Sequence, residues 1–137
     1  MFEATHSDRS SAPPAAIWAL WADPERWPDW NEQLDTAELS GPLAVGTEAV
    51  IKFKRGGRMH FKVVALEAGR LLTDEAKFPG CRFGHEHLVE PDGTGSRITH
   101  RLYFAGFTSG FFSRMLGRKR MEESVVGFVE RERKLAE

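Results

Sequence analysis

The sequence predicts an α+β fold in which a curved antiparallel sheet wraps around a long C-terminal helix. Three observations indicate this fold. Turn signals rich in glycine and proline recur between residues 41 and 95, separated by runs of strand length. Two short helical segments between residues 13 and 30 follow a first strand and precede this run of strands. The last segment, from about Ser109 to the end, has apolar residues at helical spacing.

The two short helical segments are bounded by prolines. Pro13 or Pro14 suits a first helical turn, where its missing N–H has no partner to lose, and Asp23-Pro24 ends that helix. Pro28 breaks the next one. We expect the tryptophans to stabilise this corner by burying aromatic surface rather than to bind a ligand. They are Trp18, Trp21, Trp27 and Trp30.

The register of the last two strands follows from their charges. If the loop between Pro91 and Ser96 joins them, Glu90 faces Arg97 and Glu86 faces Arg101. Such cross-strand pairs of opposite charge belong to a solvated face. The period of two then assigns the opposite, inner face to apolar residues and three histidines. These residues are Phe83, His85, His87 and Val89 on one strand and Ile98, His100, Leu102 and Phe104 on the other.

Earlier strands extend this inner face. Phe53 and Phe61 alternate with lysines and a histidine on their own strands, and Asp74 shares a face with Leu72 and Ala76. Asp74 is therefore an inward carboxylate by prediction. An apolar bowl with a few polar groups is the usual composition of a small-molecule site.

The C-terminal segment is predicted to be one amphipathic helix. Phe111, Met115, Met121, Val125, Phe128 and Leu135 recur at spacings of three and four and are expected to face the core. A basic run precedes Glu122 and Glu123, and a solvated helix face is the simplest interpretation of it. This run comprises Arg114, Arg118, Lys119 and Arg120.

Composition limits the function. The 137 residues suit one domain spanning 1–137, and 41% hydrophobic with 28% charged residues is typical of a globular protein. A net charge of −1 argues against nucleic acid as a partner. The single cysteine, Cys81, excludes an internal disulfide. Glu3 and Asp8 interrupt any signal peptide, so we expect a cytoplasmic protein without stable membrane insertion, as a monomer or homodimer.

Several short motifs resemble a known family. They are Ala12-Pro13 with Trp18 and Leu20, then Asp23, then Trp27-Pro28-Asp29-Trp30-Asn31, Leu39, Gly41, Gly46-Thr47, Gly95-Ser96-Arg97, Thr99-His100 and Gly106. Over nearly the whole chain the sequence resembles polyketide cyclase/dehydrase-type members of the SRPBCC superfamily, which also includes START lipid-transfer domains and the major pollen allergens. The resemblance implies a helix-grip fold with a cavity for a hydrophobic ligand. It implies no particular reaction.

The leading hypothesis is a module that binds a small hydrophobic or polycyclic molecule, lipid-like or polyketide-like, between sheet and helix. No cofactor and no metal are expected. The predicted pocket residues are Phe53, Phe61, Phe83, His85, His87, His100, Leu102, Phe104, Phe111 and Met115.

Three alternatives stay open. A cofactor-independent cyclase or dehydratase would use His87 or His100 as general base, oriented by Asp74. A metal site would use His85, His87 and His100, with Asp74 as a fourth ligand. A protein-interaction domain would instead fill its interior with side chains and bind no ligand.

Overall fold

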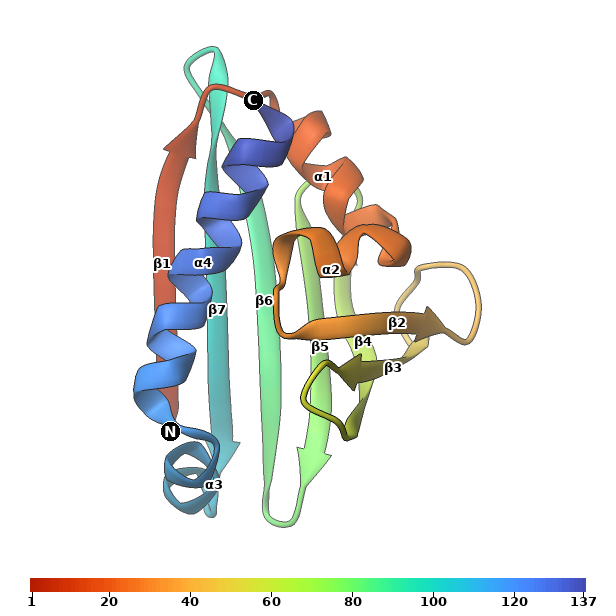
Figure 1. Cartoon of the computed structure of the whole chain (residues 1–137), viewed down its shortest axis with the longest axis vertical. Coiled ribbons are helices and arrows are strands. Elements are labelled where there is room, and N and C mark those ends of the chain that lie inside the picture. The colour runs from red at the N-terminus through yellow and green to blue at the C-terminus, as the bar shows by residue number, and fades with distance from the viewer.

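The computed structural model describes all residues, 1–137, and consists of one seven-stranded antiparallel sheet with helices on one side (Figure 1). The strand order is β1-β7-β6-β5-β4-β3-β2. The elements in chain order are β1 (Phe2–Ser10), α1 (Pro14–Ala22), the 3-10 helix η1 (Pro24–Arg26), α2 (Trp27–Trp30), β2 (Leu34–Leu39), β3 (Glu48–Phe53), β4 (Arg58–Glu67), β5 (Leu71–Phe78), β6 (Cys81–Asp92), β7 (Gly95–Gly106), α3 (Ser109–Leu116) and α4 (Arg118–Ala136).

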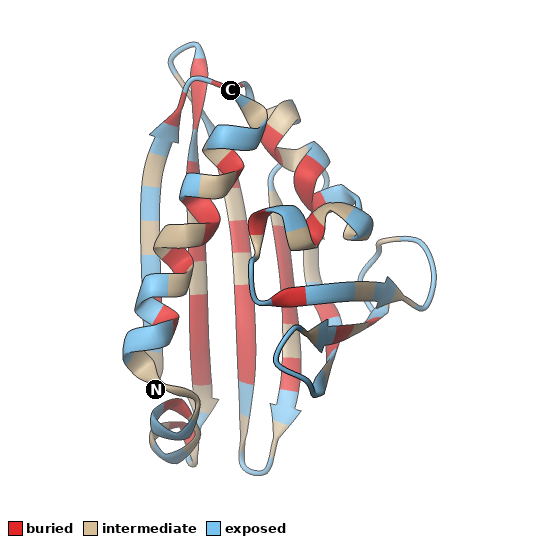
Figure 2. Ribbon diagram, in the orientation of Figure 1, coloured by how far each residue is buried: buried red, intermediate tan, exposed pale blue.

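The helices cover one face of the sheet. Helix α4 packs on β1 and β7, and α1 packs on β6 and β7. Figure 2 shows buried positions along the strands beneath these helices and along the side of α4 that faces them. None of the helices is long and apolar enough to cross a bilayer. The predicted α+β helix-grip arrangement is therefore confirmed.

The predicted register of the last hairpin is confirmed. Glu90 lies opposite Arg97 and Glu86 opposite Arg101, and the Arg101 guanidinium donates to the Glu86 carboxylate at 3.2 Å. His87 and His100 are direct cross-strand neighbours. The inner-face residues predicted from this register are buried or nearly so, because α1 and α4 cover them.

The tryptophan corner also forms as predicted. Trp21, Trp27 and Trp30 are buried, whereas Trp18 is half-buried. The indole of Trp27 donates to the carbonyl of Trp21 at 2.8 Å, and the indole of Trp30 donates to the carbonyl of Leu20 at 3.3 Å. These bonds attach η1 and α2 to the end of α1 and fix the inner position of the Trp30 ring.

The single C-terminal helix predicted from the sequence is wrong in one respect. Gly117, with a φ of +99°, separates α3 from α4, and only glycine adopts such a φ readily. Because the chain changes direction there, residues of α3 that share the helical spacing of the apolar residues of α4 do not face the core. Phe111 and Met115, predicted to be core, are 65% and 60% exposed.

Candidate functional site

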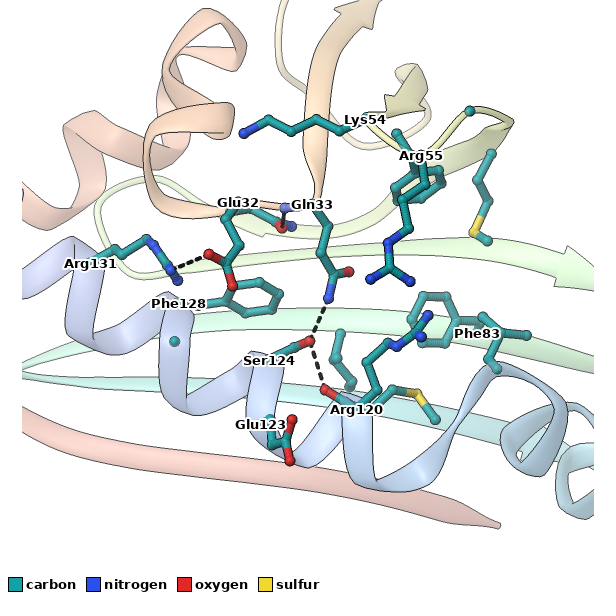
Figure 3. A pocket seen from close by; sticks show the side chains of 18 of the residues that line it. Glu32, Gln33, Lys54, Arg55, Phe83, Arg120, Glu123, Ser124, Phe128 and Arg131 are labelled. Carbon is teal, nitrogen blue, oxygen red and sulfur yellow. Dashed lines mark hydrogen bonds and ion pairs between the residues drawn. The ribbon is translucent and has the colours of Figure 1, made fainter.

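A groove of about 860 Å³ runs beside α4 from Arg120 to Arg131, between that helix and the loops that flank β2 and β3 (Figure 3). Its apolar wall combines residues from the sheet and from both C-terminal helices. This wall comprises Phe53, Met59, Phe83, Leu102, Met115, Leu116, Met121 and Phe128. Gly56 and Gly127 also line it, and its polar residues are Asn31, Glu32, Gln33, Lys54, Arg55, Arg120, Glu123, Ser124 and Arg131.

Two arginines meet over the groove. The β3–β4 hairpin turns through Gly56 and Gly57, whose φ values are 95° and 85°, and this turn holds Arg55 at the rim. Arg120 reaches up from the first turn of α4, and Figure 3 shows the two guanidinium groups pointing toward one another near Phe83. Neither guanidinium forms an ion pair with a carboxylate. Two cationic groups in this arrangement favour an anion between them.

The other end of the groove is closed by polar contacts between α4 and the segment after α2. Arg131 pairs with Glu32 at 2.5 Å, and the Gln33 amide donates to the Ser124 hydroxyl at 2.9 Å. That hydroxyl in turn donates to the backbone carbonyl of Arg120 at 2.8 Å. These contacts hold α4 against the loop and set the width of the groove (Figure 3).

Behind the groove lies a cluster of three histidines. His85 and His87 come from β6 and His100 from β7, and their exposed fractions are 9%, 2% and 0%. The Nε2 atom of His85 lies 2.8 Å from Nδ1 of His100, and Nε2 of His100 lies 2.7 Å from Oε1 of Glu132. The indole of Trp21 donates to the other oxygen of Glu132 at 2.6 Å. A continuous hydrogen-bonded chain therefore joins β6, β7, α4 and α1.

Aromatic rings enclose this cluster. His87 donates from Nδ1 to the carbonyl of Leu72 at 2.8 Å and stacks on His85, with ring centroids 3.8 Å apart. Trp30 packs against all three imidazoles at 5.5–6.2 Å. Phe128 stacks on His85 at 5.1 Å and also lines the groove, so its ring separates the two sites.

Burial controls the protonation of these groups. It lowers the pKa of His85 and His87 well below the usual value and that of His100 to about 3, because a charged imidazole loses its hydration there. Burial likewise raises the pKa of Glu132 well above its usual value, and that of Asp74 to about 7. The Oδ1 atom of Asp74 has no hydrogen-bond partner.

The structure distributes the predicted pocket residues over four environments. Phe53, Phe83, Leu102 and Met115 line the groove. The three histidines form the buried cluster, with Asp74 on the neighbouring strand directly opposite His85. Phe61 and Phe104 are buried in the sheet core, and Phe111 points to solvent.

Sequence reasoning misses the arginines of the groove. It places Arg120 on a solvated helix face and assigns no role to Arg55. The glycine pair is the available signal, since a tight hairpin beside a predicted pocket places its flanking side chains at the rim. Glu132, which links His100 to Trp21, could not be predicted, because its spacing from the histidines in the sequence matches no known motif.

Comparisons with known proteins agree with this architecture. The family model described as polyketide cyclase / dehydrase and lipid transport matches residues 1–137. No curated protein sequence gives a significant match.

Three solved structures illustrate the fold similarity. Protein MLL2253 from Mesorhizobium loti has a TM-score of 0.74 at 19% identity, with 98% of this chain and 96% of that chain covered. Norcoclaurine synthase from Thalictrum flavum, in complex with dopamine and hydroxybenzaldehyde, has a TM-score of 0.72 at 17% identity, covering 98% and 85%. Protein TTHA0849 from Thermus thermophilus has a TM-score of 0.72 at 16% identity, covering 98% and 97%. At these identities the likeness concerns the fold alone.

Proposed function

Because this chain belongs to the polyketide cyclase / dehydrase and lipid transport family, we propose that it binds a small, largely apolar ligand with an anionic group in the groove beside α4. The apolar body of the ligand lies on Phe83, Leu102 and Phe128, and the anionic group lies between Arg55 and Arg120. The observation that carries this proposal is the pair of facing guanidinium groups without carboxylate partners above an apolar wall.

The size and composition of the groove support a compact ligand. A volume of about 860 Å³ lies in the range of sites that hold small organic molecules. Met59, Met115 and Met121 contribute flexible thioether side chains, which adapt to ligands of different shape. Aromatic rings with a carboxylate or sulfonate substituent match both the wall and the arginines.

Binding is proposed here rather than turnover by the histidines. None of His87, His100 and Asp74 lines the groove, and the ring of Phe128 lies between the groove and the imidazoles. A substrate in the groove would reach those side chains only if Phe128 moved. Acid–base chemistry requires hydrogen-bond reach to the reacting group.

A matched pair of fluorescent probes tests this function. The probe 8-anilinonaphthalene-1-sulfonate carries a sulfonate, whereas N-phenyl-1-naphthylamine shares its ring system without the charge. The double variant Arg55→Gln/Arg120→Gln should weaken binding of the sulfonate by roughly tenfold or more, since charged hydrogen bonds are lost, and should leave the neutral probe nearly unaffected. Arg114→Gln, an exposed arginine of α3 outside the groove, is the control.

A second substitution tests the contact of the ligand with the apolar wall. Met115→Gln should weaken both probes, while Leu135→Gln, at an exposed apolar residue outside the groove, should weaken neither. Because both positions are exposed, neither change should unfold the protein. Equal binding of the sulfonate to the wild type and to the double arginine variant would overturn the proposed role of the arginines. Binding unaffected by Met115→Gln would place the ligand elsewhere.

A further inference from the structure

The buried histidine cluster is separate from the groove, and its geometry points to a second site. We propose that His85, His87 and His100 bind one divalent transition metal ion, with zinc as the best match. One ligand atom from each ring lies within 4.8 Å of the other two, and all three side chains are buried. Three imidazoles are an established ligand set for zinc with one open position.

The hydrogen bonds of the outer nitrogens select the nitrogens that can bind the metal. Nε2 of His100 faces the Glu132 carboxyl, so Nδ1 is its free nitrogen. Nδ1 of His87 donates to the carbonyl of Leu72, which leaves Nε2. Histidines that bind metals commonly donate their other N–H to a carboxylate or a backbone carbonyl, which fixes the ring and its tautomer. His87 already has this arrangement, and His100 takes it when Glu132 ionises and accepts from Nε2.

Metal binding displaces the proton that His85 and His100 share. In the metal-free cluster a proton lies between its Nε2 and Nδ1 of His100, which are 2.8 Å apart. When both nitrogens bind a metal at about 2.0–2.1 Å, the tetrahedral angle separates them by roughly 3.3 Å. The cluster therefore opens by about half an ångström, the two metal-facing nitrogens lose the proton that they share, and neutral His85 carries its own proton on Nδ1 in the bound state.

Asp74 is placed to accept a hydrogen bond from Nδ1 of His85. It pairs with His85 across β5 and β6, so both side chains are on the same face of the sheet. It is 3% exposed, and its Oδ1 atom has no hydrogen-bond partner. A buried acceptor without a partner is costly, and an N–H on His85 Nδ1 would remove that cost.

The charges also balance around a divalent cation. The core contains two carboxyl groups, Asp74 and Glu132, and no arginine or lysine contacts either of them. Metal binding ionises both groups and releases two protons to solvent, so that two carboxylates supply two negative charges around a metal held by three neutral imidazoles. Burying an ion is favourable only where opposite charge and hydrogen bonds compensate for its lost hydration.

Metal binding is measured on tag-free protein, because a histidine tag would bind the same ions. After treatment with a chelator, Co²⁺ or Zn²⁺ is added both to the native protein and during refolding, since the cluster is enclosed. We expect one ion per chain, the visible absorption bands of tetrahedral Co²⁺, and a zinc-dependent rise in Tm. Co²⁺ should also quench the tryptophan fluorescence, because Trp21 and Trp30 lie 5.5–6.2 Å from the imidazoles.

His85→Gln and His100→Gln should abolish the cobalt bands, whereas His60→Gln, at an exposed histidine, should retain them. Circular dichroism checks that the variants fold. If they do not, the wild-type protein alone decides: absence of both the cobalt bands and the zinc-dependent rise in Tm overturns the proposal. The same bands in folded His85→Gln would also overturn it. Arg55→Gln/Arg120→Gln should bind the metal normally, which separates this site from the proposed ligand groove.

Discussion

The Nε2 atom of His100 lies 2.7 Å from Oε1 of Glu132, and neither side chain has any exposed surface. Glu132 belongs to α4 and His100 to β7, while the second oxygen of Glu132 accepts the indole N–H of Trp21 in α1. One carboxyl group therefore connects the long helix, the sheet and the first helix in the core of the protein.

Glu132→Gln should lower the free energy of unfolding only slightly, whereas Glu132→Ala should lower it strongly. Burial raises the pKa of Glu132 well above its usual value, so an amide replaces the protonated carboxyl at similar size. We expect Glu132→Gln to lower the free energy of unfolding by about 1 kcal/mol or less in metal-free protein. Glu132→Ala leaves the indole N–H of Trp21 and Nε2 of His100 without partners and creates a cavity, which should lower the free energy of unfolding by about 3–5 kcal/mol.

Urea unfolding of both variants measures these values. A small loss for Glu132→Ala would mean that water replaces the carboxyl and that the connection between α1, α4 and β7 contributes little. A large loss for Glu132→Gln would instead mean that Glu132 is ionised in the metal-free protein. The buried His100 would then be its charged partner.

Asp74 should make stability depend on pH. Its pKa is raised from 3.8 to about 7, first by burial and then by the charge of Glu75. The folded protein therefore keeps a proton that the unfolded chain releases, and the stabilisation present below pH 3.8 is lost as the pH rises to about 7. One pKa unit corresponds to about 1.4 kcal/mol, so up to about 4 kcal/mol is lost over this range.

Asp74→Asn isolates this contribution because an amide does not titrate. The free energy of unfolding of metal-free wild type and variant should be similar near about pH 4, and the variant should be the more stable near about pH 8. Taking the difference between the two proteins removes the opposite contribution of the three histidines. A difference that does not change with pH would show that Asp74 titrates normally in the folded protein.

Contacts between residues close together in the sequence were predicted, whereas contacts between distant segments were not. The register of β6 and β7 followed from Glu86 and Glu90, because pairing across one short loop is fixed by local charges. The inward histidines and Asp74 followed from the same register. The antiparallel sheet and the tryptophan corner also agreed with the predicted fold.

The groove was harder to predict because it depends on three segments that meet only in the folded chain. Arg120 faces it because Gly117 sets the start and direction of α4, and Arg55 faces it because the β3–β4 hairpin turns toward that helix. The residue pattern within a single segment does not show that Arg55 and Arg120 face the same groove. The partnership of Glu132 with His100 was missed for the same reason, since 32 residues separate them in the chain.

Gly84 leaves room for a tyrosine. A Cβ atom at this position would lie 2.0 Å from the ring of Tyr103, whose hydroxyl donates to Glu75 and whose ring packs under the guanidinium of Arg101. Gly84→Ala should therefore displace the ring and lower the free energy of unfolding by about 1–3 kcal/mol. Gly41→Ala, which meets no atom within 4 Å, is the control and should change stability little. Equal stability of the two variants in urea unfolding would contradict the close contact.

Phe128 should control access from the groove to the histidines. Its ring, 4% exposed, lines the groove and lies 5.1 Å from His85 and 5.3 Å from His100. Phe128→Ala should lower the free energy of unfolding by about 3–5 kcal/mol and open the groove to the histidine cluster. Phe128→Leu should leave most of the cluster covered.

Modification of histidines by diethyl pyrocarbonate, located by mass spectrometry, reports this opening in metal-free protein. In the wild type only His6 and His60, which have exposed surface, should react. In Phe128→Ala, His85 should react as well, because it is the most exposed histidine of the cluster and stacks directly on the missing ring. If His85 reacts equally in the wild type, the cluster opens without the loss of Phe128, and a ligand in the groove would reach the imidazoles directly. If it reacts in neither protein, Trp30 alone is sufficient to shield the cluster.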